Sequence, residues 1–296
     1  MQHRQEMSKR AVDETERRRF EDGISDSTFP RDSVKAKTGV VRALTPEQQR
    51  ALQHNNRGLD LFAKGKLNDA IKEYEAAIRL DPKLAAAYNN LGTAHFSTGR
   101  FEQAAASFKV AVELDADFGQ ALFNLGLAEL RLGRQKEASE ALDAALRAYV
   151  TIGDSELRAG NLKEAESAYR GMLQIDPDYA PALVRLGLVL NMAGLYEEAA
   201  QYLQRLAQRE STNAPLLELL GEALYGQKKY EEAAATAERA IKLIPGSAKA
   251  HYWAGVAHAA AGHREAALAH LASLRELKSD ELAQKLSALI DKRTPR

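Results

Sequence analysis

The sequence has no cysteine, no long apolar run and no excess of charge of either sign. Without cysteine, the chain has no disulfide and no thiolate chemistry. Lysine plus arginine and aspartate plus glutamate number 41 each, which argues against bulk binding to nucleic acid. No apolar run is long enough to span a bilayer, and the first residues lack the apolar core of a secretion signal. We therefore expect a cytoplasmic protein with no membrane insertion.

Catalytic motifs are missing as well. The chain contains no Gly-rich phosphate loop, no nucleophile elbow and no paired metal-ligand motif. The Glu-Glu pairs at 197–198 and 231–232 open expected helices, where the helix dipole favours acidic residues. We predict that the protein is not an enzyme and uses no cofactor.

What the chain does contain is alanine and leucine in a repeating order. Hydrophobic residues make up 45% of the sequence, and alternating strand-like runs are sparse, which favours an all-α fold. A fixed period of about 34 residues is typical of solenoids. The matching pairs, each 34 residues apart, are Gly58 and Gly92, Gly65 and Gly99, Ala70 and Ala104, Tyr74 and Phe108, and Ala77 and Ala111.

The order Leu-Gly, then Ala-x3-aromatic, then Asp-Pro resembles the tetratricopeptide repeat, a helix–turn–helix unit. The resemblance covers residues 46–281 and implies a right-handed α-solenoid of about seven helical pairs. The aromatic residue is expected to fill the gap between repeats. We expect repeats near 51–84, 85–118, 119–145, 146–179, 180–213, 214–247 and 248–281, followed by a capping helix over 279–291.

The ends of the chain differ from this array. Residues 1–44 are polar and charged, so we expect a disordered or weakly ordered tail ahead of a solenoid that spans 45–291. The alternative is a docking segment that lies in the protein's own groove. Thr45 and Pro46 are typical of a helix start. Residues 292–296 are expected to fray.

One joint in the array is short. Gly133 and Gly160 are 27 residues apart, and the seven missing residues correspond to about two helical turns. No glycine or proline lies between Arg134 and Ile152 to form a turn. We predict one helix through 134–159 that divides the array into two lobes. A tight turn is the alternative.

In the family that the pattern resembles, the first helix of each repeat lines a concave surface. Asparagines recur there, and their amides can pair with a peptide backbone. We predict a peptide-binding ladder like those of peptide-binding tetratricopeptide superhelices, although asparagine is also a common polar residue on exposed helices. The ladder asparagines are Asn55, Asn56, Asn89, Asn90 and Asn124, and the expected apolar pockets are formed by Leu59, Phe62, Phe96, Phe123 and Leu127.

Two other sites are disfavoured. Of the residues required by the family's clamp for chaperone C-termini, only Asn90 is present. The four histidines of the last repeat, which fall on two helices, are expected to serve packing rather than to hold a metal. They are His251, His258, His263 and His270.

The sequence therefore predicts a non-enzymatic scaffold that binds an extended segment of a protein partner. Two alternatives share this architecture. One is a self-assembling structural scaffold, which would be a homo-oligomer, and the other is an accessory subunit of a multi-component protein-modifying enzyme. Fold alone does not separate them or identify the partner.

Overall fold

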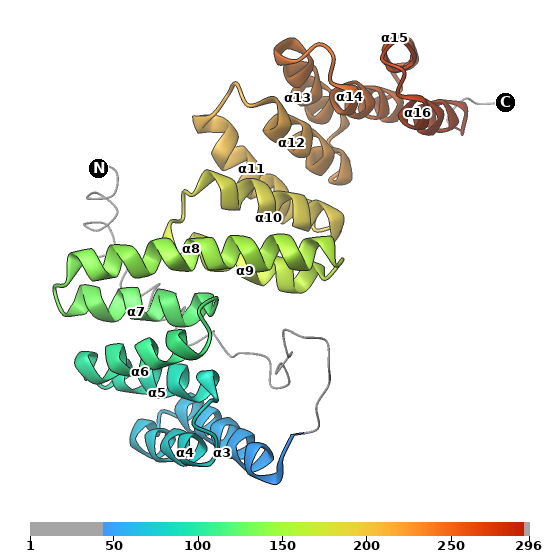
Figure 1. The fold of residues 1–296 in the computed structure, drawn as a ribbon. Coiled ribbons are helices and arrows are strands. Elements are labelled where there is room, and N and C mark those ends of the chain that lie inside the picture. Colours follow the sequence, from blue (N-terminus) through green and yellow to red (C-terminus); the bar gives the residue numbers. More distant parts are fainter. Residues whose placement is uncertain (1–43, 293–296) are drawn as a thin grey trace. The chain divides into compact units, whose positions relative to one another are not determined.

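The computed structural model describes residues 44–292 (Figure 1). Nearly all of the tail predicted over residues 1–44 lies outside this range, as do residues 293–296. All regular elements in the described part are α-helices, which confirms the all-α solenoid. They are α3 (Pro46–Ala63), α4 (Leu67–Leu80), α5 (Ala85–Ser97), α6 (Phe101–Leu114), α7 (Gly119–Arg131), α8 (Gln135–Arg158), α9 (Leu162–Ile175), α10 (Ala180–Met192), α11 (Tyr196–Arg209), α12 (Ala214–Gly226), α13 (Tyr230–Leu243), α14 (Ala248–Ala261), α15 (Arg264–Glu276) and α16 (Asp280–Lys292).

The chain divides into two compact units. Unit 1 runs to Thr151 and includes Gln174–Asp176, whereas unit 2 contains Ile152–Leu173 and the chain from Pro177 onward. Unit 1 thus holds α3 to α7, the first part of α8 and the last residues of α9. Unit 2 holds the rest of α8, most of α9, and α10 to α16. The boundary falls inside α8.

In most helical pairs an aromatic or leucine side chain of the second helix packs on a glycine of the first helix, whereas Gly221 of α12 faces Ala237. In unit 1, a Cβ added to Gly58 would lie 2.4 Å from the Tyr74 ring, and one added to Gly92 would lie 2.6 Å from the Phe108 ring. Both glycines belong to the same repeat as the ring they touch. Each ring also belongs to a core cluster that includes the next repeat, Tyr74 with Ala94 and Phe108 with Leu125, as expected for a residue that fills the gap between repeats.

The turns within the pairs use left-handed backbone. Gly65 and Gly99 have φ of +71° and +75°, a region that glycine enters without steric cost. In unit 2, Lys228 occupies the equivalent position with φ of 64°. A residue with a side chain is strained in this backbone conformation, so the turn at Lys228 is less favourable than the turns at Gly65 and Gly99.

The short joint is one continuous helix. α8 spans Gln135–Arg158, 24 residues, which confirms the predicted fusion and leaves no tight turn between Ala145 and Thr151. Ala138, Ala145 and Tyr149 lie buried along one stripe of this helix. The joint is shorter than the 34-residue period by about two helical turns, so the buried stripe stays on the same face of the helix. Continuing the helix through the joint therefore loses no burial.

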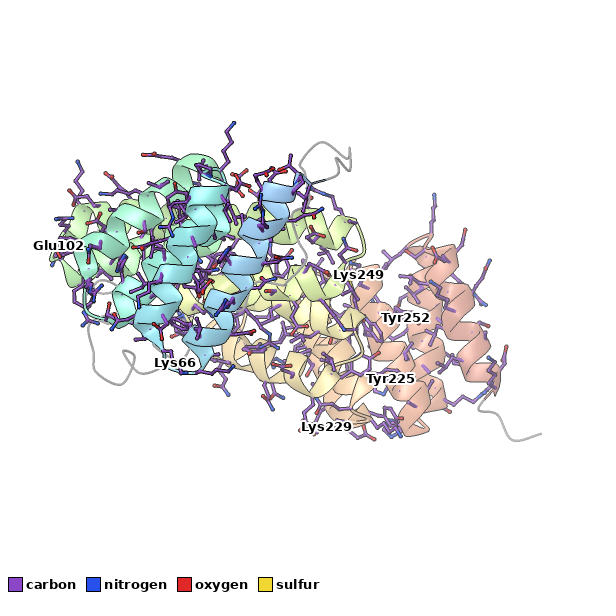
Figure 2. The ribbon with its side chains drawn as sticks, turned by 90° about the horizontal axis from the view of Figure 1, so that it is seen from below. Lys66, Glu102, Tyr225, Lys229, Lys249 and Tyr252 are labelled. Atoms are coloured by element: carbon purple, nitrogen blue, oxygen red, sulfur yellow. The ribbon has the colours of Figure 1, made fainter. Side chains whose placement is uncertain are left out.

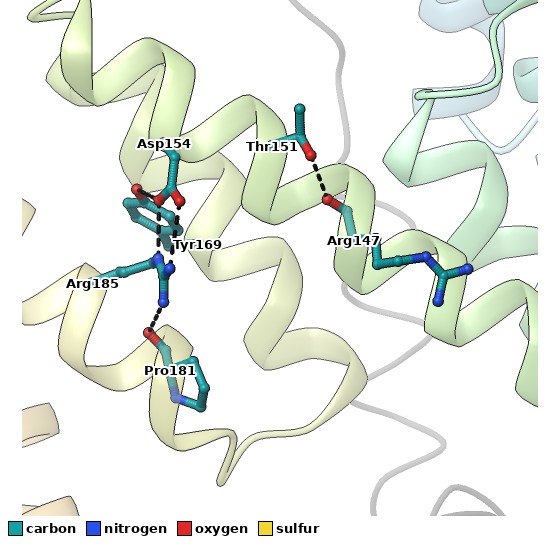
Figure 3. Close-up of polar contacts among 6 residues, drawn as sticks. All are labelled: Arg147, Thr151, Asp154, Tyr169, Pro181 and Arg185. Atoms are coloured by element: carbon teal, nitrogen blue, oxygen red, sulfur yellow. Dashed lines mark hydrogen bonds and ion pairs between the residues drawn. The ribbon is translucent and has the colours of Figure 1, made fainter.

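The C-terminal part of α8 packs as the first helix of the next pair. Gly153 lies under the ring of Tyr169 on α9, at a Cβ distance of 2.4 Å. Asp154 accepts hydrogen bonds from the Tyr169 hydroxyl at 2.7 Å and from Nε of Arg185 at 2.9 Å (Figure 3). The hydrogen bond from Arg185 holds the pKa of Asp154 below its usual range, although partial burial opposes this shift. The C-terminal part of α8 is therefore hydrogen-bonded to both α9 and α10.

The predicted helix start and end cap are present. Thr45 forms a capping box with Gln48, and Pro46 is the first residue of α3. α16 spans Asp280–Lys292 and buries Leu286, in place of the expected 279–291. Within residues 44–292, each helix is either too short or too polar to cross a membrane.

Candidate functional site

The predicted site lies on the first helices of unit 1, namely α3, α5 and α7. We refer to the surface formed by the predicted asparagine and apolar residues of these helices as the ladder face. Helical pairs place successive first helices side by side, so equivalent positions recur along this face.

The asparagines of the ladder face hydrogen-bond to one another. Asn90 Nδ2 donates to Asn55 Oδ1 at 2.9 Å, and Asn124 Nδ2 donates to Asn89 Oδ1 at 3.0 Å. Each pair joins an amide of one repeat to the amide one position earlier in the preceding repeat. All four side chains are buried, with exposed fractions of 2–8%.

The second pair extends into a longer chain of donors and acceptors. Gln120 Nε2 donates to Asn124 Oδ1 at 3.0 Å, and the Tyr149 hydroxyl donates to Gln120 Oε1 at 3.1 Å. Burial raises the pKa of Tyr149, so its hydroxyl stays protonated and serves as the donor. This chain links α5, α7 and α8 within unit 1.

The pairing changes the role of the predicted ladder. Four of the five asparagines satisfy one another inside the fold, because a buried amide that lacks a partner is costly. Asn56 is different: it is half-buried, and its side chain makes no hydrogen bond with residues 44–292. Asn56 is thus the predicted amide that the fold leaves available.

The predicted apolar residues also divide into two groups. Phe123 and Leu127 are only 1% and 7% exposed, so they belong to the core and offer almost no surface. Leu59 and Phe62 are half-buried against the cluster formed around Tyr74. Phe96 is half-buried as well, and its ring meets Phe101 edge-on at 5.2 Å.

The accessible part of the ladder face therefore combines one free amide with three partly exposed apolar side chains. These four residues are Asn56, Leu59, Phe62 and Phe96.

Unit 2 carries a polar cluster that our sequence interpretation did not single out. Glu222 of α12 is half-buried, and burial raises its pKa, although Lys249 and a hydrogen bond with Asn191 oppose this shift. Asn191 of α10 donates from Nδ2 to Leu219 O at 2.9 Å. Its Oδ1 is buried and has no hydrogen-bond partner within the described chain. An unpartnered acceptor thus lies next to a carboxyl whose pKa is raised.

A row of aromatic rings lies on the same helices. Tyr225 and Trp253 have ring centroids 5.8 Å apart, and Trp253 and Tyr252 have centroids 5.2 Å apart. Figure 2 shows Tyr225, Lys249 and Tyr252 along α12 and α14. All three aromatic side chains are half-buried.

The sequence held a signal for these residues. Glu222 and Tyr225 occupy the ninth and twelfth positions of their repeat, and Lys249 the second position of the next. Those positions belong to the surface that the family resemblance implies.

Models of the tetratricopeptide repeat match the chain from residue 58 to residue 290. One, described as TPR repeat, matches residues 58–99. A second model, described as tetratricopeptide repeat, matches residues 99–149 and 150–215. A third model with the same description matches residues 190–245 and 224–290.

Solved structures of such proteins are similar to this chain. YrrB, a TPR protein with an unusual peptide-binding site, is 25% identical with a TM-score of 0.36, over 73% of this chain and 97% of that one. A tetratricopeptide repeat protein from Parabacteroides merdae is 20% identical with a TM-score of 0.40, over 82% and 99%. The second TPR of Spaghetti, bound to an HSP90 peptide, is 28% identical with a TM-score of 0.34, over 34% and 94%. No curated protein matches significantly.

Proposed function

We propose that this chain, which belongs to the tetratricopeptide repeat family, binds an extended segment of a protein partner along the ladder face of unit 1. Tetratricopeptide repeats typically act as non-catalytic protein-interaction modules. We also propose that residues 45–291 form one solenoid of two lobes, with the helix through 134–159 between repeats 1–3 and repeats 4–7.

The observation that carries the proposal is the unused amide of Asn56 beside exposed apolar surface. An amide can donate to and accept from a peptide unit, which gives affinity for an extended backbone. Leu59 and Phe62 lie one and two helical turns further along α3, where they would receive apolar side chains of the partner. Phe96 on α5 adds a ring that stays partly exposed.

The buried amide pairs have a supporting role in this proposal. They fix the stagger of α3, α5 and α7, so the accessible groups are held at set spacings before the partner arrives. A surface that is ordered in advance loses less conformational entropy on binding.

The test starts from peptides selected on the wild-type protein from a displayed library of random sequences, with affinities measured by fluorescence anisotropy. Asn56→Ala should weaken binding about 2- to 12-fold, which corresponds to one hydrogen bond of about 0.5–1.5 kcal/mol. Phe62→Ala should weaken it further, because it removes apolar contact area.

The matched control is Asn68→Ala, which removes the same amide from an exposed position on α4. It should leave peptide affinity unchanged. Equal affinity of Asn56→Ala and wild type would contradict the proposal. If the library yields no binders and the mass measured by light scattering rises with concentration, self-assembly is the better account.

A further inference from the structure

Four histidines of unit 2 lie close together near the carboxylate of Glu238, where α13, α14 and α15 meet. Glu238 of α13, His258 of α14 and His270 of α15 each offer a ligand atom, and these three atoms lie within 4.8 Å of one another. His251 and His263 border the group through ring contacts with His270 and His258. The group is separate from the ladder face, which belongs to unit 1.

The hydrogen bonds around His270 fix its tautomer. The carbonyl oxygen of Pro245 can only accept, so His251 donates to it from Nε2 at 3.0 Å. A neutral His251 then accepts at Nδ1, which lies 3.1 Å from Nδ1 of His270. His270 therefore donates from Nδ1 and keeps its lone pair on Nε2. This arrangement is typical of metal-binding histidines, whose second nitrogen is held by a hydrogen bond.

His258 and Glu238 lie near the spacing of neighbouring ligands. His258 Nε2 lies 2.8 Å from Glu238 Oε1, and a proton on Nε2 occupies the space between them. Bond lengths of about 2.0–2.2 Å to a tetrahedral zinc place two ligand atoms about 3.3–3.6 Å apart, so a metal could replace this proton if the two atoms separate by less than about 1 Å. When a metal replaces the proton on Nε2, His258 can carry its proton on Nδ1 instead. This Nδ1 lies 3.4 Å from Nδ1 of His263, which can accept a hydrogen bond from it.

We propose that Glu238, His258 and His270 form a binding site for a divalent transition-metal ion, with Zn²⁺ as the ion of choice. Two imidazoles and one carboxylate suit zinc, and three protein ligands leave a fourth position open to water or to a ligand. The side chain of Glu238 is 45% exposed, so an ion can enter from solvent. His251 and His263 are positioning residues that orient the two ligand rings.

The experiment titrates the chelator-treated full chain with Zn²⁺ by calorimetry. Wild type should bind one ion per chain, and Glu238→Gln, His258→Gln and His270→Gln should each lower the affinity at least about 10-fold. The matched control is His54→Gln in unit 1. His54 Nδ1 lies 2.7 Å from Glu73 Oε2, the same kind of pair, but no third ligand completes a group there in the described chain. This variant should bind zinc as wild type does.

A second measurement on wild type guards against variants that fold poorly. Co²⁺ bound by two imidazoles and a carboxylate should give the visible absorption of a four-coordinate ion, and one equivalent of Zn²⁺ should remove it. The site is disproved if wild type shows only the spectrum of hydrated Co²⁺. It is equally disproved if all three ligand variants retain wild-type stoichiometry and affinity, which would indicate adventitious binding only.

Discussion

The first helices of unit 1 are joined by neutral amide pairs, whereas the first helices of unit 2 carry a half-buried carboxyl and aromatic side chains. In unit 1, Asn90 and Asn55 satisfy each other in the interior. In unit 2, Glu222 sits half-buried with a raised pKa, next to an Asn191 oxygen that lacks a partner among the described residues. The paired amides of unit 1 are therefore satisfied within the fold, whereas the Asn191 oxygen of unit 2 is not.

The framework beneath these surfaces is nevertheless the same. Gly58 lies under Tyr74 in unit 1, and Gly153 lies under Tyr169 in unit 2, each with a Cβ distance of 2.4 Å. Close approach of the two helices in a pair depends on these glycines rather than on the polar residues. The comparison shows that the repeat separates positions that build the fold from positions that are free to specialise.

The largest effect is expected at α8, which contains the boundary between the units. Ala148→Pro should lower the free energy of unfolding by about 3 kcal/mol or more, because proline removes a helix hydrogen bond and clashes with the preceding turn. Urea denaturation followed by circular dichroism measures this loss.

The control for α8 is Ala116→Pro. Ala116 follows Asp115 between α6 and α7, where the first repeat has Pro82 after Asp81. Proline should be tolerated there. Equal stability of the two proline variants would mean that α8 is not continuous in solution.

A loss of about 1–3 kcal/mol is expected when one member of an amide pair in unit 1 is removed. Asn90→Ala leaves the buried Asn55 amide without its partner, whereas Asn56→Ala removes a half-buried amide that has none in the described fold. Thermal or urea unfolding should separate the two variants. If they are equally stable, the pairs do not support unit 1.

The same pair offers a stricter test through a double-mutant cycle. Asn55→Ala combined with Asn90→Ala should cost less than the sum of the two single changes, because the double variant buries no orphaned amide. Additive losses would indicate that the two residues do not interact.

The turns give a smaller effect of opposite sign in the two units. Lys228→Gly in unit 2 should raise the free energy of unfolding by about 1 kcal/mol, because glycine removes the strain at φ of 64°. Gly65→Ala in unit 1 should lower it by about the same amount, since it introduces that strain at φ of +71°. Lys229→Gly is the control, because the backbone at Lys229 has an ordinary φ of −85°. A gain from Lys229→Gly equal to that from Lys228→Gly would contradict the strain argument.

The smallest effect concerns Glu222 and depends on pH. Burial raises its folded pKa above the unfolded value, so its contribution to stability is full below the unfolded pKa and is lost as pH rises through the folded pKa. Glu222→Gln keeps the shape but cannot ionise. Its stability relative to wild type should therefore increase with pH across that window.

Urea unfolding of both proteins at a series of pH values measures this difference. Lys249 attracts the ionised form of Glu222 and so reduces the rise in its pKa. When both proteins also carry Lys249→Ala, the pH-dependent difference in stability between Glu222 and Glu222→Gln should therefore be larger. A difference that does not change with pH would show that Glu222 titrates normally.

The sequence alone determined the repeat framework. The 34-residue period, the glycines at the turns and the apolar stripe through Ala138, Ala145 and Tyr149 were sufficient to predict the helical pairs and the continuous α8. These features are local or periodic, because a helix places residues three and four apart on one face whatever its surroundings. Residues 1–43 lie outside the described structure, so the predicted tail stays a prediction.

Only the tertiary structure decided which side chains meet. The sequence aligned Asn56 with Asn90 and Asn124, but the stagger between neighbouring helices pairs Asn90 with Asn55 and leaves Asn56 available. The same packing buries Phe123 and brings the histidines of two helices to one carboxylate. Periodicity fixes the face on which a residue lies, whereas the relative rotation and displacement of packed helices depend on how all their side chains interlock.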